Sequence, residues 1–308
     1  MTDQKADVDT CPLVSVCIPT YNRCEQLKTA VESVLKGSYD HVAIIISDNA
    51  SSDGTQEWCE SVCAADNRVS YFRHEVNQGP TRNFEFARSK ANGQYFVWLG
   101  DDDYLSPDYI EVCVAALEAD ASLVLVSGVG RFHTGNVLLD LQPDFFQLTA
   151  GPAFVRVAKY LWLVGDNSIY YGIYRSEMVE NISLVNCIAG DWVWMAEVLA
   201  RGKAKMVDPI IVHREQGDNT SSSMEKMVKV LRYPPERTLP AYRHCDESYQ
   251  VCGRIESRGE EKGAWQHICA LRCRVGCVSE GVTIKCKAAF KVFHPRKDKC
   301  GFGMKNTD

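Results

Sequence analysis

Short apolar runs alternate with amphipathic stretches through about the first 130 residues of the chain. Runs of branched, aromatic and other apolar residues predict buried strands at 13–18, 42–47, 69–73, 95–99 and 123–126. Apolar residues at helical spacing predict helices at 24–35, 55–64, 79–91 and 108–118. This alternation is typical of a mostly parallel sheet with helices on both faces. We therefore expect an α/β fold whose first strand ends at Pro19.

Polar residues follow three of these strands at the point where each strand ends. Pro19–Tyr21 follow the first strand, Asp48 closes the second, and Asp101–Asp103 follow the fourth. In open α/β sheets, ligands bind beyond the carboxyl ends of the strands. We therefore expect these residues to lie on one rim of the sheet and to form a ligand site.

The pattern is weaker after residue 126. Two more strands are expected at 169–174 and 205–212, and a helix at 191–201. From residue 222 onward the apolar spacing is helical and amphipathic. We expect a disordered tail at residues 1–11, a main domain at 12–220 and a helical, basic extension at 221–308.

Composition excludes some classes of protein. The 308-residue chain carries a formal net charge of -6, which argues against a nucleic-acid-binding protein. No apolar run reaches the roughly 18 residues of a membrane-spanning helix, and the polar start of the chain is unlike a signal peptide. These features predict a cytoplasmic protein.

Positive charge gathers at the C-terminal end of the chain. The segment Ala264–Asp308 holds nine basic and three acidic residues, an excess of six positive charges. Apolar residues among these lysines and arginines suit a helix that lies on an anionic membrane, which would hold the protein at the inner face of the membrane. The same pattern suits a solvated amphipathic helix packed on the main domain, and the sequence leaves both interpretations open.

Four blocks of sequence carry a resemblance to a known family. They lie at strand ends or helix starts, in the order Val16–Arg23, Ile46–Thr55, Asn77–Asn83 and Ala91–Asp103. In these blocks the chain resembles the family 2 glycosyltransferases, which are inverting enzymes with the GT-A fold, and the resemblance extends over residues 13–215. It implies a Rossmann-like, mostly parallel sheet flanked by helices, followed here by the helical extension. It also implies a nucleotide-binding half, residues 12–103, and an acceptor half, residues 104–220.

The resemblance implies a donor site for a nucleoside-diphosphate sugar, with UDP the nucleotide it favours. It implies contacts to the base for Pro19, Tyr21 and Asp48. An aspartate at the end of a strand can accept a hydrogen bond from the imide N–H of uracil, and thymine would serve equally well. Arg82 opens a helix at the same rim, where a guanidinium suits a phosphate.

The acidic triplet Asp101–Asp103 is the candidate metal site. Hard oxygen ligands hold Mn²⁺ or Mg²⁺, and such a cation neutralises the charge that develops on a leaving diphosphate. The resemblance implies that Asp101 reaches the ribose and Asp103 the metal. The run of three leaves the register open, and Asp102 is placed with the donor nucleotide. His213, after the last expected strand, is a candidate further metal ligand, and Arg214 is expected in a loop over the diphosphate.

An inverting transfer needs a base that takes the proton of the acceptor hydroxyl. The resemblance places a carboxylate at the start of a helix downstream of the metal motif, and Asp191 in Gly190-Asp191-Trp192 fits this place. The family's common Glu-Asp pair is here Gly-Asp, which leaves one carboxylate. Aromatic faces stack on sugar rings, so aromatic residues and neighbouring polar residues between the metal motif and the base are candidates for binding the acceptor. These candidates are Trp162, Asp166, Asn167, Tyr170, Tyr171 and Trp192.

The implied activity is sugar transfer to a hydroxyl of a glycan, a polysaccharide or a lipid-linked acceptor. One alternative is a sugar nucleotidyltransferase, which would show a glycine-rich loop with a basic residue after the first strand. Here Pro19–Arg23 stand at that place and speak against it. The other alternative is a non-catalytic protein that binds nucleotide-sugars as a scaffold, against which the carboxylates Asp48, Asp103 and Asp191 speak.

Overall fold

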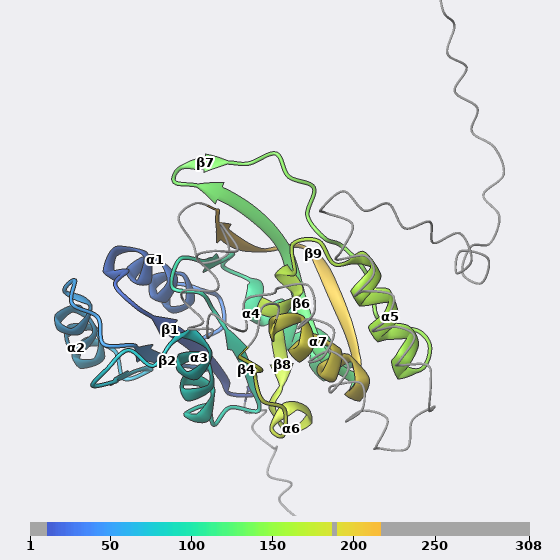
Figure 1. Ribbon diagram of the computed structural model, residues 1–308, viewed down its shortest axis with the longest axis horizontal. Helices are drawn as coiled ribbons and strands as arrows, with labels where there is room; N and C mark the ends of the chain where they lie inside the picture. Colours follow the sequence, from blue (N-terminus) through green and yellow to red (C-terminus); the bar gives the residue numbers. More distant parts are fainter. Residues whose placement is uncertain (1–10, 187–189, 217–308) are drawn as a thin grey trace, which may run out of the picture.

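The computed structural model describes residues 11–186 and 190–216 (Figure 1). The expected C-terminal extension, with its membrane interpretation, and all but one residue of the expected N-terminal tail lie outside these described residues. Among the described residues, no helix combines the length and the apolar character needed to cross a membrane.

One sheet runs through the described part of the chain. Its strands are ordered β3-β2-β1-β4-β8-β6-β9-β5, with β7 paired to β6. The strands are β1 Val14–Thr20, β2 Val42–Asp48, β3 Val69–Arg73, β4 Tyr95–Trp98, β5 Tyr104–Leu105, β6 Leu123–Thr134, β7 Val137–Leu138, β8 Ile173–Arg175 and β9 Lys203–Glu215. The helices are α1 Cys24–Leu35, α2 Thr55–Ala65, α3 Pro80–Ser89, α4 Tyr109–Ala119, α5 Ala153–Leu163, α6 Ser176–Val179 and α7 Gly190–Arg201, with a 3₁₀ helix η1 at Ser168–Tyr171.

The sheet is mostly parallel, as expected. Strands β3, β2, β1 and β4 run parallel to one another. The short strand β8 pairs antiparallel with both β4 and β6, and β9 is parallel to β6. An α/β fold with a mostly parallel sheet flanked by helices is therefore confirmed.

Helices cover both faces of this sheet (Figure 1). Successive side chains of a strand point to opposite faces, so Val16 and Ile18 of β1 join one core and Cys17 joins the other. Helices α1, α2 and α4 pack into the core on the Val16 side. Helices α3, α5 and α7 pack into the core on the Cys17 side. The polar residues at the strand ends lie on the rim of the sheet, between the two helical layers.

Several expected element boundaries differ from the structure: the strand expected at 123–126 is β6, which runs on to Thr134, and the strand expected at 205–212 is β9, Lys203–Glu215. The first strand does not end at Pro19 but runs on to Thr20. Strand β4 pairs with β1 only as far as Cys17, so Pro19 needs no N–H for a ladder on that side. The strand expected at 169–174 is instead η1 followed by β8, because Asn167, in the left-handed region with φ 54°, starts a 3₁₀ turn.

Candidate active site

Asp101 lies directly beyond β4 and is tied to the end of β1. Its Oδ2 accepts hydrogen bonds from Thr20 Oγ1 at 2.8 Å and from the Tyr21 N–H at 3.3 Å. Burial, together with the negative charge of Asp102, raises the pKa of Asp101, and the nearby Arg23 opposes this rise. The carboxyl ends of β1 and β4 therefore carry a preformed polar junction.

Arg23 neutralises part of the acidic triplet. Its Nη1 lies 3.0 Å from Asp101 Oδ1 and 2.7 Å from Asp102 Oδ2. Arg23 is not among the site residues expected from the sequence, although it is the last residue of the first of the four blocks. No residue close to it along the chain indicates an acidic partner. The structure supplies that partner from 78 residues further on.

Two carboxylate oxygens of the triplet converge over Gly100. A Cβ at Gly100 would lie 2.9 Å from Asp103 Oδ2 and 3.0 Å from Asp102 Oδ1, so a larger residue there would displace one or both carboxylates from this arrangement. Within residues 11–186 and 190–216, no three His, Cys, Asp or Glu side chains gather as a complete ligand set. Mg²⁺ commonly binds through one or two carboxylates and takes its remaining ligands from water and substrate phosphates. The residues present therefore fit a divalent cation that is held together with a diphosphate.

Arg214 of β9 faces Asp103. Its Nε lies 3.8 Å from Asp103 Oδ2, while Asp103 Oδ1 accepts a hydrogen bond from the Glu215 N–H at 3.2 Å. Burial and the charge of Asp102 raise the pKa of Asp103, and Arg214 opposes that rise. The guanidinium lies over the ring of Tyr171, 4.8 Å from its centroid, and its buried Nε donates no hydrogen bond within the described residues.

His213 is the neighbour of Arg214 on β9, and its side chain has other partners. Its ring stacks on Tyr104 at a centroid distance of 4.3 Å, and its Nδ1 lies 2.8 Å from Nε2 of His133. Burial, followed by the positive charge of a protonated His133, lowers the pKa of His213 to about 4. Because successive side chains of a strand alternate, His213 and Arg214 point to opposite faces. The role of His213 as a metal ligand stays a prediction.

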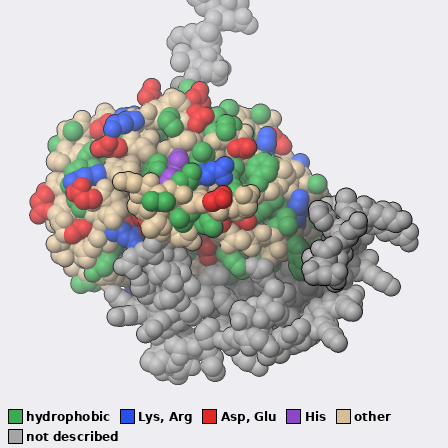
Figure 2. Space-filling model, turned by 90° about the horizontal axis from the view of Figure 1, so that it is seen from above, with side chains coloured by type: hydrophobic (Ala, Val, Ile, Leu, Met, Phe, Trp, Pro, Cys, Tyr) green, Lys and Arg blue, Asp and Glu red, His purple; other side chains and the backbone are tan. Residues whose placement is uncertain are grey.

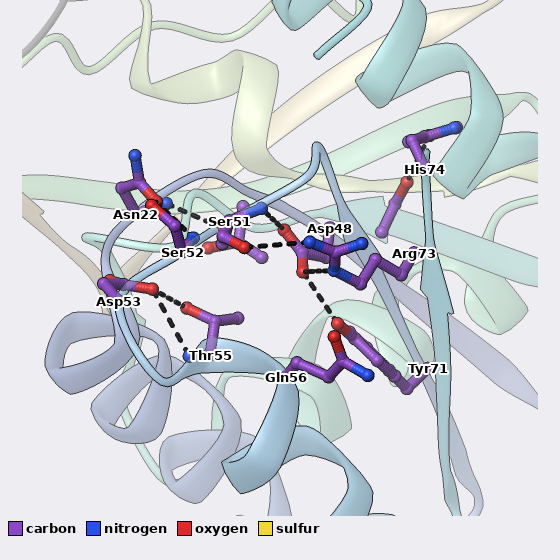
Figure 3. Close-up of polar contacts among 12 residues, drawn as sticks. Asn22, Asp48, Ser51, Ser52, Asp53, Thr55, Gln56, Tyr71, Arg73 and His74 are labelled. Carbon is purple, nitrogen blue, oxygen red and sulfur yellow. Dashed lines mark hydrogen bonds and ion pairs between the residues drawn. The ribbon is translucent and has the colours of Figure 1, made fainter. Parts of the chain in front are cut away.

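Asp48 closes β2 and lies at the centre of a buried hydrogen-bond cluster (Figure 3). Its Oδ1 accepts from the Ser51 N–H at 2.8 Å, and its Oδ2 accepts from the Tyr71 hydroxyl at 2.7 Å. Arg73 Nε lies 3.6 Å from the same oxygen. The side chain of Asp48 has no exposed surface, so a nucleotide base can reach it only if one of these neighbours moves.

The other expected donor residues differ in exposure. Pro19 is buried within β1, whereas Tyr21 is 46% exposed and is free to offer its ring to a base. Arg82 is exposed in the first turn of α3. The next residue, Asn83, is buried and donates to the carbonyl oxygens of Thr20 at 3.2 Å and Ser47 at 2.9 Å. Asn83 thereby holds the start of α3 against the ends of β1 and β2.

Asp191 is the second residue of α7, a helix in the same layer as α3 and α5. Its Oδ2 accepts a hydrogen bond from Asn167 Nδ2 at 2.7 Å. Burial raises the pKa of Asp191, and the Asn167 hydrogen bond and the charge of Arg214 act against that rise. A half-buried carboxylate with a raised pKa is suited to accepting a proton near neutral pH.

Three of the acceptor candidates lie at different depths. Trp162 is 58% exposed near the end of α5. Tyr171 is partly buried beneath the guanidinium of Arg214. Trp192 is partly buried and packs against the core that α7 shares with α5. On the face of the molecule shown in Figure 2, acidic, basic and apolar side chains are interspersed.

Comparisons with known proteins agree with this architecture. The chain is 33% identical over 181 residues to the abequosyltransferase RfbV of Salmonella typhimurium, an alignment that covers 58% of this chain and 48% of that protein. It is 27% identical over 176 residues to GalNAc(5)-diNAcBac-PP-undecaprenol beta-1,3-glucosyltransferase of Campylobacter jejuni, covering 55% of this chain and 54% of that protein. The chain thus spans about half the length of these two relatives.

A solved structure shares the fold. S. aureus TarS in complex with UDP-GlcNAc matches with a TM-score of 0.62 at 16% sequence identity, covering 84% of this chain and 71% of that one. This likeness confirms the GT-A fold. The family model described as glycosyl transferase family 2 matches residues 15–183, which is more than half of the chain. The chain therefore belongs to glycosyl transferase family 2.

Proposed function

We propose that this protein is an inverting glycosyltransferase that moves a sugar from a nucleoside-diphosphate sugar to an acceptor hydroxyl. The observation that carries the proposal is the convergence of Asp102 and Asp103 over Gly100, on the rim to which Asp48 and Tyr21 are also attached. Family membership supports the same reaction class. The names of the relatives, one of which acts on an undecaprenol-linked glycan, support a glycan or lipid-linked acceptor.

The donor is expected along the ends of β1, β2 and β4. Tyr21 offers its exposed ring to the base, with Pro19 beneath it and Asp48 as the hydrogen-bond acceptor for the imide N–H. Asp101 and Asp102 lie on the ribose side, and Arg82 is available for a phosphate. UDP is the proposed nucleotide, a choice supported by the UDP-GlcNAc complex of the structurally similar TarS.

Asp103 would hold Mn²⁺ or Mg²⁺, with Asp102 beside it on the side of the donor nucleotide. When bound, such a cation neutralises negative charge on the diphosphate as the sugar leaves. Arg214 provides a second, permanent positive charge next to Asp103, at 3.8 Å. Its buried Nε, which lacks a hydrogen-bond acceptor among the described residues, is available for an anionic oxygen.

Asp191 is the proposed base. The oxygen of the acceptor hydroxyl attacks the anomeric carbon from the side opposite the diphosphate, and its proton passes to the Asp191 carboxylate. A new C–O bond forms to the acceptor while the bond between the anomeric carbon and the diphosphate oxygen breaks, and the electron pair leaves with the nucleoside diphosphate. Attack from the opposite side inverts the configuration of the sugar. Arg214 is close enough to lower the pKa of both Asp103 and Asp191, which links the two ends of this reaction.

A panel of nucleotide-sugars tests the proposal. We expect release of nucleoside diphosphate from one donor when Mn²⁺ or Mg²⁺ and acceptor extracts are present. The Asp191→Asn variant should bind this donor normally and turn over on the order of 10²- to 10⁴-fold more slowly, because it lacks the base. Formation of nucleoside triphosphate and sugar 1-phosphate from the donor when pyrophosphate is added would indicate a nucleotidyltransferase, and donor binding without any turnover would indicate a scaffold. Near-wild-type turnover of Asp191→Asn would refute the assignment of the base.

A further inference from the structure

The side chain of Asn167 connects Asp191 to the core. Its Nδ2 donates to Asp191 Oδ2 at 2.7 Å, and its Oδ1 accepts from the Tyr160 hydroxyl at 2.8 Å. An ionised carboxylate only accepts hydrogen bonds, so the amide must turn its NH₂ group toward Asp191 and its oxygen toward Tyr160. Tyr160 is fully buried in α5, so the amide is anchored to a rigid part of the molecule.

The backbone of Asn167 is also held in place. It lies in the left-handed region, at φ 54°, which asparagine tolerates better than most residues. Asp144 Oδ2 accepts hydrogen bonds from the N–H groups of Gly165 at 2.8 Å, Asp166 at 2.9 Å and Asn167 at 3.3 Å. One carboxylate thereby fixes the whole 165–167 turn.

The same turn holds the arginine next to the metal motif. Arg214 Nη1 donates to the Asp166 carbonyl at 2.7 Å and lies 3.4 Å from Ser168 Oγ. Its Nε faces Asp103 at 3.8 Å. The 165–168 turn therefore contacts Asp191 through Asn167, and it contacts the acidic triplet through Arg214.

We propose that Asn167 is a positioning residue for the transfer reaction: its amide, locked by Tyr160, orients the Asp191 carboxylate toward the acceptor hydroxyl and favours its ionised form. This inference rests on the proposed role of Asp191 as the base. The Gly-Asp sequence in α7 lacks the second carboxylate of the family's usual pair, and Asn167 supplies from another segment a partner for the remaining one. A hydrogen bond donated to an ionised carboxylate stabilises that form.

The charged and titratable groups around Asp191 are few among the described residues. Arg214 of β9 lowers its pKa. Tyr170 and Tyr171 of η1 and Tyr174 of β8 lie near it, and burial raises the pKa of each hydroxyl, so all three are neutral at physiological pH. Loss of the Asn167 amide leaves the backbone N–H groups of Trp192 and Asp191 and the charge of Arg214 to favour the ionised carboxylate, so the pKa of Asp191 should rise.

The test uses the full chain with its donor, metal and acceptor. In Asn167→Gly the amide is lost and the left-handed backbone is kept without strain. We expect kcat to fall on the order of 10- to 100-fold, because a displaced base costs about this much. The acid limb of the pH profile of kcat should move to higher pH, while the donor KM and the nucleotide-induced thermal shift stay unchanged. Asn167→Asp should show the same upward move, because a second carboxyl beside Asp191 disfavours its ionisation.

A pair of tyrosine variants separates positioning from simple loss of stability. Tyr160→Phe removes the hydroxyl that locks the amide, and Tyr109→Phe removes an equally buried hydroxyl that bonds Gly128 and Tyr171 backbone atoms. Both should lower the melting temperature, but only Tyr160→Phe should lower kcat. If Asn167→Gly keeps the wild-type kcat and pH profile while Asp191→Asn is inactive, the positioning role is wrong and the base assignment stands. If Asp191→Asn is itself active, the proposed base fails first.

Discussion

The two halves of the sheet build their polar sites in different ways. In residues 12–103, the proposed nucleotide-binding half, the candidate donor side chains lie at the ends of adjacent parallel strands and bond to neighbouring strand residues. The bond from Thr20 to Asp101 and the bond from Tyr71 to Asp48 are of this kind. In the acceptor half, Asp191 and Arg214 come from a helix and a strand, and a turn between them, at 165–168, provides their common support.

This difference explains what the family match covers. The matched segment ends at residue 183, so it includes the strand ends and the triplet but neither Asp191 nor Arg214. A parallel sheet fixes where a residue after a strand must lie, and a motif at that place can be recognised in distant relatives. A side chain whose position depends on an irregular turn leaves no comparable mark in the sequence. The nucleotide-binding half should therefore be sensitive to local changes, and the acceptor half to changes at a distance.

The largest effect is expected from Asp103→Ala. This change removes the proposed metal ligand and leaves Arg214 without its acidic partner, so metal-dependent donor binding should be lost and kcat/KM should fall by at least about 100-fold. Titration of Mn²⁺ in the presence of the nucleoside diphosphate measures the loss. Asp102→Ala is the matched control for the register. If it abolishes metal binding and Asp103→Ala does not, the ligand assignment moves by one residue.

A change at Asp48 should affect both stability and donor binding. Asp48→Ala leaves the Ser51 N–H and the Tyr71 hydroxyl without their acceptor, at a cost of about 1–3 kcal/mol for each buried group that stays unsatisfied. Urea unfolding measures this loss, and isothermal titration with the nucleotide should show weaker binding. Tyr71→Phe is the companion variant, because it frees one oxygen of Asp48 without removing the carboxylate. Unchanged nucleotide affinity in Asp48→Ala would exclude Asp48 from base recognition.

Asp191→Asn should make the acceptor half more stable while it stops the reaction. Burial raises the pKa of Asp191, so the folded protein binds its proton more tightly than the unfolded chain does. Above the ordinary aspartate pKa of about 4, this carboxylate therefore makes the folded state progressively less stable as the pH rises. The neutral amide removes that cost, and the variant should have a higher melting temperature than the wild type at pH 7.5. At pH 4 the difference should shrink. Equal curves at both pH values would mean that the carboxylate is well solvated.

The smallest effect is expected from Arg82→Ala. The side chain is exposed at the start of α3, so its loss should leave the melting temperature unchanged and raise the donor KM by about 3- to 10-fold through one lost phosphate contact. Steady-state kinetics at two salt concentrations tests this, because the contribution of an exposed charge weakens with salt. Asn83 next to it gives the contrast, since Asn83→Ala removes buried hydrogen bonds and should destabilise the fold instead.

The sequence predicted the regular part of the fold well. The spacing of Leu27, Val31 and Val34 located α1 at its observed bounds, and the run at 69–73 matches β3. It did not predict α5, although Ala153, Val157 and Tyr160 stand at helical spacing and form the buried face of this helix. The strand expected at 169–174 coincides with β8 only at Ile173 and Tyr174, and the antiparallel pairing of β8 with two strands distant along the chain was not predicted.

The periodicity of the chain alone indicated candidate site residues only beside strand ends, whereas the resemblance was needed to propose Asp191 at the start of a helix. Asp48 and Asp101–Asp103 could be identified from the strand ends. The partners of these residues could not, because the contact between Arg23 and the triplet depends on two strands becoming neighbours in the sheet. Asn167 was one of several acceptor candidates on the basis of sequence, and only its hydrogen bonds to Asp191 and Tyr160 distinguish it.

Strands from the two parts of the chain alternate within one sheet, and this limits how the specificity of such an enzyme can be altered. Strand β8 comes from the acceptor half and pairs with β4, while β5, directly after the triplet, pairs with β9 at the far end of the chain's described part. The two halves are thus interleaved in one sheet and do not form exchangeable modules. A chain cut near residue 103 would leave open strand edges on both pieces. A change of acceptor specificity therefore has to be made on a sheet that stays whole, and it has to keep Asp144 and the 165–168 turn that supports Asp191 and Arg214.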